Sequence, residues 1–146
     1  MSAAWRTVAA VPAADLVEPR VQLHYAAQHV AAACDALSPP APDASHKAFG
    51  YDPATVSLTS REIDGHAPFR VRLVVPDFRL ETAAADGTVH ASFPLTGRTD
   101  AEAVAWVEAQ AKALVGADAT VPPHGYETDF PAHAVGDGAA YSVEAG

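Results

Sequence analysis

The sequence predicts an α+β fold, in which an antiparallel sheet of three or four strands is covered on one face by two helices. Three observations indicate this class: an amphipathic helical pattern near the start, alternating apolar and polar residues in the middle, and a second helical pattern after them. Each segment is apolar on one side only, so packing both helices on one face of a sheet buries all the apolar stripes.

The first predicted helix runs from about residue 18 to residue 37. Asp15 and Glu18 resemble a capping box, whereas Pro19 fits the first helical position, so the start stays open between these alternatives. Pro39 ends the helix, because the residue before a proline is pushed out of the helical region. The apolar stripe, with its steps of three and four residues, comprises Leu16, Leu23, Ala27, Val30, Cys34 and Leu37.

Residues 38–55 are predicted to form a connection without regular structure, and the strands follow it. Segments 56–59 and 69–75 alternate apolar with polar residues, as half-buried strands do. The alternation slips at Pro76, which predicts a bulge or a tight turn. Gly87, preceded by an aspartate, predicts a hairpin between strands 78–83 and 88–95, because glycine accepts the positive φ of a tight turn.

The second helix is predicted to begin at a capping box of Thr99 and Glu102 and to end at Gly116. The residues after it follow neither period, but they space apolar side chains such as Phe130 and Tyr141 among prolines and glycines. We therefore expect one α+β domain over residues 1–116. Residues 117–146 are expected to form an irregular C-terminal arm that packs on the same domain or on a partner.

Composition and charge limit the partners of this chain. Its 146 residues match the size of one domain, and 49% hydrophobic content suffices for a core without disulfides. A formal charge of −9 repels nucleic acid and anionic membrane surfaces, and no apolar run is long enough to span a membrane. The start lacks a signal-peptide pattern, and Cys34 as the single cysteine cannot form an internal disulfide, so a cytoplasmic location is expected.

A candidate polar site combines the first helix with the connection after it. His24 and Gln28 share a helix face, and Asp43 and His46 follow. The two imidazoles could act as metal ligands or acid–base groups that the other two residues orient. Two histidines without a third strong ligand fall short of zinc spacing, so no metal or cofactor is predicted, and the alternative is local hydrogen bonding at the core edge. His29 lies about 140° around the helix from His24 and is predicted to be solvated.

A second candidate site is an island of arginines in the strand region. Its members are Arg61, Arg70, Arg72 and Arg79, four of the nine basic residues. These side chains could dock an anion, an acidic partner or the carboxylates of the arm. The alternative is a solvated face with cross-strand pairs to Glu62 and Glu81.

Two further groups receive structural rather than functional interpretations. Cys34 falls on the apolar stripe and is expected to be a buried, inert thiol. In the arm, His124 and His133 flank Glu127 and Asp129, where adventitious cation binding is favoured over a built site.

Four segments of the chain resemble a family of bacterial proteins with no assigned activity. They are LHYAAQHVAAACDAL, PDASH, LTGRTDAEAVAWV and FPAHAVGDGAAY. The resemblance implies a bacterial origin, and it assigns no catalytic residue.

The sequence favours a non-enzymatic binding or protein-interaction domain. It has no phosphate-binding glycine loop, no G-x-S-x-G elbow and no H-E-x-x-H motif. Together with the arm and the arginines, this indicates a protein partner or self-association through the arm. Two alternatives stay open: a small metal-assisted or acid–base enzyme that uses the residues of the candidate polar site, and a small-molecule binding domain with the arm as a lid.

Overall fold

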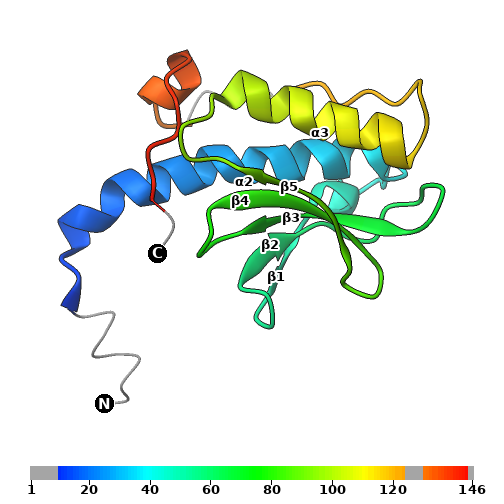
Figure 1. The fold of residues 1–146 in the computed structure, drawn as a ribbon, viewed down its shortest axis with the longest axis horizontal. Helices are drawn as coiled ribbons and strands as arrows, with labels where there is room; N and C mark the ends of the chain where they lie inside the picture. The colour runs from blue at the N-terminus through cyan, green and yellow to red at the C-terminus, as the bar shows by residue number, and fades with distance from the viewer. Residues whose placement is uncertain (1–9, 124–129, 145–146) are drawn as a thin grey trace.

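The computed structural model describes residues 10–123 and 130–144, and it confirms the α+β class. Helices α2 (Val17–Leu37) and α3 (Asp100–Leu114) lie on the same side of one antiparallel sheet (Figure 1). The strands follow one another across the sheet in chain order: β1 (Gly50–Asp52), β2 (Ser57–Thr59), β3 (Phe69–Val74), β4 (Arg79–Ala84) and β5 (Val89–Pro94). Three short 3-10 helices complete the described elements: η1 (Ala13–Leu16), η2 (Ser45–Lys47) and η3 (Ala134–Asp137).

The sheet has five strands among the described residues, so the predicted number of three or four was wrong. The additional strand is β1, which lies inside the connection predicted to be irregular. Three residues are too few to show an alternating pattern, and Gly50 is a poor strand former. Pairing with β2, in which Gly50 faces Thr59 and Asp52 faces Ser57, therefore makes this segment a strand.

Two tight turns connect β3, β4 and β5 as the sequence predicted. Between β3 and β4, the N–H of Phe78 donates to the carbonyl of Val75 at 3.2 Å, and the turn passes through Pro76. Between β4 and β5, Gly87 has a φ of 92° and its N–H donates to the carbonyl of Ala84 at 2.9 Å. Both turns reverse the chain tightly enough to keep consecutive strands paired.

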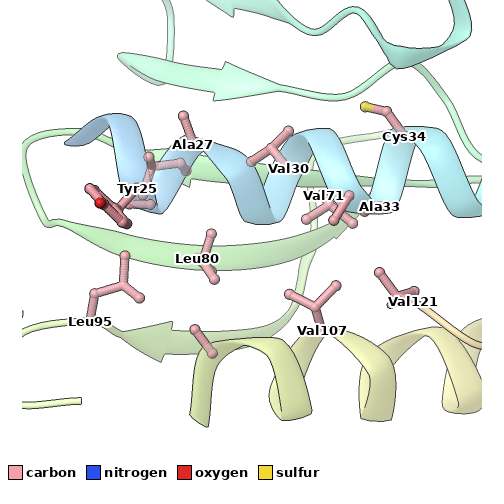
Figure 2. Close-up of a cluster of buried hydrophobic side chains, with 14 of the residues drawn as sticks. Tyr25, Ala27, Val30, Ala33, Cys34, Val71, Leu80, Leu95, Val107 and Val121 are labelled. Atoms are coloured by element: carbon pink, nitrogen blue, oxygen red, sulfur yellow. The ribbon is translucent and has the colours of Figure 1, made fainter. Parts of the chain in front are cut away.

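Helix α2 is the centre of the molecule, because it contacts β2 and β3 on one side and α3 on the other. Every residue from His29 to Cys34 is buried. His29 is 4% exposed, so the prediction that it is solvated was wrong. Figure 2 shows the core around Val30 of α2, where side chains from β3, β4 and α3 converge.

Helix α3 begins at the predicted capping box. The N–H of Glu102 donates to Oγ1 of Thr99, and the Glu102 carboxylate accepts from the N–H of Thr99. The buried face of α3 carries Ala103, Val107 and Ala111. Neither α3 nor any other helix in the described ranges is both long and apolar enough to cross a membrane.

The described residues of the arm pack against the same chain. Val121, Val135 and Tyr141 belong to the core cluster, and Thr96 and Thr99 form isolated β-bridges with the end of the arm. His124, Glu127 and Asp129, which were considered for adventitious cation binding, lie outside the described residues.

Candidate functional site

An apolar groove lies at the N-terminal end of α2, where this helix extends beyond the sheet (Figure 1). The groove has a volume of about 340 Å³ and is open to solvent. Arg20 is the one charged residue among those that line it. The lining residues are Leu16, Pro19, Arg20, Leu23, Val75, Phe78 and Val143. They come from three parts of the chain, which form three walls.

The first wall belongs to α2 and depends on where this helix begins. Pro19 is the third residue of α2, in the first turn, where backbone N–H groups have no partner inside the helix. The helix can therefore start at Val17, ahead of the proline, and η1 precedes it directly from Ala13. Leu16, Pro19 and Leu23 follow one another at steps of three and four residues, so they share the face that lines the groove.

The second wall is the turn between β3 and β4. Phe78 has a φ of 43°, in the left-handed region that bulky side chains rarely adopt. In this conformation its side chain is buried, and its ring meets the ring of Tyr141 edge-on with 5.6 Å between centroids. Phe78, in this strained conformation, therefore packs the turn against the arm.

The third wall is Val143 of the arm, which buried polar contacts hold in place. Oε1 of Gln22 accepts from the backbone N–H of Ser142 at 2.9 Å, and Nε2 of Gln22 donates to Oγ of Ser142 at 2.8 Å. Thr96 Oγ1 donates to the carbonyl of Val143. Gln22 is buried, so loss of these bonds would leave its amide without full hydrogen bonding.

A second polar contact anchors the arm next to this wall. The hydroxyl of Tyr141 donates to Oδ1 of Asp100 at 2.7 Å, and Nε2 of His29 lies 2.9 Å from the same oxygen. Nε2 faces a carboxylate, so it carries the proton and donates. Three distant parts of the chain, α2, the start of α3 and the arm, thus meet at one carboxylate.

Glu18 adds a charged contact between α2 and the arm. Its Oε1 accepts from Nε2 of Gln22 at 2.8 Å and from Nε2 of His133 at 2.7 Å. These hydrogen bonds, first from Gln22 and then from His133, hold the pKa of Glu18 below its ordinary value of 4.5. A lowered pKa stabilises the folded state above pH 4.5, and this contribution is lost as the pH falls through the folded-state pKa.

The two histidines of the candidate polar site do not meet. Nε2 of His46 lies 3.2 Å from Oδ1 of Asp35, whereas His24 is exposed and lies beside the ring of Phe130. Asp35 follows His24 by eleven residues on α2, which is about 16 Å along the helix axis. The two imidazoles are therefore placed too far apart to share a ligand.

Gln28 and Asp43, the other members of that set, make local hydrogen bonds. Nε2 of Gln28 donates to the carbonyl of His24 at 3.3 Å, and Oδ1 of Asp43 accepts from the N–H of Ser45 at 3.0 Å. Within residues 10–123 and 130–144, no three His, Cys, Asp or Glu side chains are grouped to hold a metal ion. The four residues of the candidate polar site therefore share no pocket in which they could act together as acid–base groups.

The four candidate arginines separate into two pairs. Nε of Arg72 and Nε of Arg79 each donate to one oxygen of Glu81 at 2.7 Å, so the cross-strand pairing with this glutamate is present. Glu81 is 1% exposed although it points away from the helices, because the two arginines cover it. Arg61 and Arg70 lie apart from this network and line a separate hollow beside β1.

Several residues that build the site were not singled out from the sequence. Gln22 and His29 are seven residues apart, two helical turns, so they share a face of α2. Tyr25, Ala26 and Ala33 lie on the same face at steps of three and four residues, so the two polar residues stand within an apolar face, and this signal could have found them. Tyr141, Ser142 and Asp100 carry no comparable local signal, because their partners are distant in the sequence.

Comparison with models of protein families, with curated proteins and with solved structures finds no match. The fold and the site themselves give the class of the protein. Its described residues form an α+β domain of two helices and five strands, with an apolar groove that the arm of the same chain completes.

Proposed function

We propose that this chain is a non-enzymatic protein-interaction domain that binds an apolar segment of a partner protein in the groove at the start of α2. The observation that carries this proposal is the concentration of exposed apolar side chains around the start of α2, the end of the helix at which the groove lies. Val11, Leu16 and Val17 are 44%, 45% and 51% exposed. They are three of the six large apolar side chains found exposed among the described residues. Burying one such side chain contributes about 1.5–3 kcal/mol.

The shape of the groove favours a protein segment over a small molecule. Small-molecule sites usually bury about 70–90% of their ligand, whereas this groove is open to solvent. An amphipathic helix or an extended segment can place apolar side chains in such a groove and keep its other face in water.

Charge favours a partner other than a second copy of the chain. Each copy carries a formal charge of −9, so two copies repel each other. Arg20 forms no ion pair with any residue in the described ranges, and it lies at the groove. The proposed segment therefore carries a carboxylate next to its apolar anchors, where the Arg20 guanidinium can bind it.

Selection of peptides from a random displayed library, followed by fluorescence polarisation on the full chain, tests the proposal. We expect selected peptides to combine an acidic residue with apolar residues at helical or alternating spacing. Leu16→Asp should weaken binding about 10- to 100-fold, because it removes an apolar contact and adds a charge. Arg20→Glu should weaken it further by repelling the peptide carboxylate.

Val89→Asp is the matched control, since Val89 is 43% exposed but lies on β5, away from the groove. Equal effects of Leu16→Asp and Val89→Asp would contradict the proposal. A variant that starts at residue 10 tests a different occupant. If it binds peptides much more tightly than the full chain, the first nine residues compete for the groove, and the partner assignment fails.

A second candidate function, small-molecule binding, is supported by the position of Val143. This arm residue forms one wall of the groove, as a lid residue would. Saturable binding of a fluorescent apolar dye that Leu16→Asp abolishes, together with a failure to select any peptide, would favour this alternative.

A further inference from the structure

A second hollow lies beside the edge strand β1. It has a volume of about 310 Å³ and is lined by residues from the start of β1, the end of β2 and the start of β3. Its charged members are Arg61 and Arg70, and none of its lining residues is acidic. This is unusual in a chain with eighteen acidic and nine basic side chains.

Arg61 and Arg70 differ from the other arginines of the sheet in lacking a carboxylate partner. Arg72 and Arg79 share the carboxylate of Glu81, and Arg79 also pairs with Asp77. Within residues 10–123 and 130–144, neither Arg61 nor Arg70 has a carboxylate oxygen within 4.0 Å. The two positive charges of the hollow are therefore not paired directly, although Asp43 lies close enough to Arg61 for the two charges to interact.

The local contacts hold one of these arginines in place. Nη1 of Arg70 donates to the carbonyl of Ser60 at 3.0 Å, which leaves the other donors of its guanidinium available. Arg61 follows Ser60 directly in the chain, and both arginines line the hollow. Asp43, whose pKa the charge of Arg61 helps to lower after two larger contributions from Ser45, is already bonded to the N–H of Ser45.

Gly50 leaves room for a ligand beside the arginines. A Cβ atom built on Gly50 would meet no heavy atom within 4 Å, so its side of the hollow is open. Phe49 adds an aromatic side chain to the lining. The volume lies at the lower end of the range of about 300–1,000 Å³ that is typical for small-molecule sites, and it exceeds the need of a free inorganic ion.

We infer that this hollow binds a small organic oxyanion, a phosphomonoester or a carboxylate with an apolar or aromatic body. The two guanidinium groups bind the oxyanion through charge-assisted hydrogen bonds, and Phe49 contacts the body of the ligand. The site is separate from the apolar groove, so it neither requires nor excludes the proposed partner binding.

Calorimetric titration with phenyl phosphate, benzoate and inorganic phosphate, each up to about 10 mM, tests the inference. We expect saturable binding of one phenyl phosphate or one benzoate per chain, tighter than that of inorganic phosphate. The comparison of the first two probes decides between phosphomonoester and carboxylate. Arg61→Gln and Arg70→Gln should each weaken binding about tenfold, since each removes one charged donor pair.

Two further variants keep the test decisive. Gly50→Val should block the hollow without loss of melting temperature, because its Cβ meets open space and valine favours a strand. Arg20→Gln is the matched control, since Arg20 also lacks an ion pair in the described ranges but lines the other groove. The inference fails if no probe binds, or if Arg20→Gln weakens binding as much as Arg61→Gln does.

Discussion

His29 of α2 and Tyr141 of the arm share one acidic partner. Nε2 of His29 and the hydroxyl of Tyr141 lie 2.9 Å and 2.7 Å from Oδ1 of Asp100, and they lie 3.2 Å from each other. Both side chains are buried, although 112 residues separate them in the sequence. The contact therefore fastens the end of the chain to the central helix and helps to hold the wall of the apolar groove.

Tyr141→Phe tests the strength of this contact. The variant keeps the ring that packs on Phe78 but removes the hydroxyl, so Asp100 and His29 lose one buried hydrogen bond. We expect the free energy of unfolding to fall by about 1–2 kcal/mol, as measured by urea denaturation. Tyr51→Phe serves as the control, because Tyr51 is exposed, and its effect should stay within about 0.5 kcal/mol. Equal effects of the two variants would show that the hydroxyl of Tyr141 contributes nothing.

Glu81→Gln tests the buried charge on the open face of the sheet. The substitution leaves Arg72, itself mostly buried, without a compensating charge. We expect a loss of about 3 kcal/mol in the free energy of unfolding. Asp77→Asn breaks an exposed ion pair with Arg79 and should cost less than about 1 kcal/mol. A loss from Glu81→Gln as small as that from Asp77→Asn would mean that water replaces the missing charge.

Local patterns predicted most of the fold. The helical periodicity predicted the first helix from about residue 18, close to its observed start at Val17, and the Thr99 capping box marked the start of α3. Neither alternative for the first helix start was right, because no side chain caps α2 and Pro19 is its third residue. The aspartate and glycine at residues 86–87 marked a hairpin. These features succeed because their cause lies within a few residues of sequence. Strand β1 was missed because only its pairing with β2 makes it a strand.

The candidate sites were harder to predict, because long-range contacts create them. The sequence indicates that Arg72 points away from the helices, but not that Glu81 is enclosed between two arginines. Likewise, Gln22 finds its partner Ser142 at a separation of 120 residues. His29 was assigned to the solvated side because it lies about 140° around α2 from His24. The arm and α3, which cover it, are distant from it in the sequence.

Cys34 is predicted to react slowly with thiol reagents in the folded protein. It is fully buried, and this burial raises its pKa to about 11. At about pH 8 almost no thiolate is present, so the reaction rate with a disulfide reagent should follow the rate of unfolding. Fast reaction in native buffer, comparable to that in denaturing urea, would contradict the burial.

The same burial makes the stability of the fold depend on pH. Because the folded-state pKa of Cys34 is raised above the ordinary value of 9.0, the protonated thiol favours folding below pH 9.0, and this contribution is lost as the pH rises to about 11.

Val56→Asn should stabilise the protein, because Val56 holds a backbone conformation that its side chain disfavours. Its φ is 49°, in the left-handed region, where a β-branched residue is strained and asparagine is tolerated. Val56 is exposed, so the substitution removes no core packing, and we expect a gain of about 0.5–1 kcal/mol in the free energy of unfolding, measured in urea. Val89→Asn is the matched control: Val89 is similarly exposed but lies in strand β5, where asparagine is a poor strand former and should lower stability by a few tenths of a kcal/mol. If both variants lose stability, asparagine does not relieve strain at Val56, and the prediction is wrong.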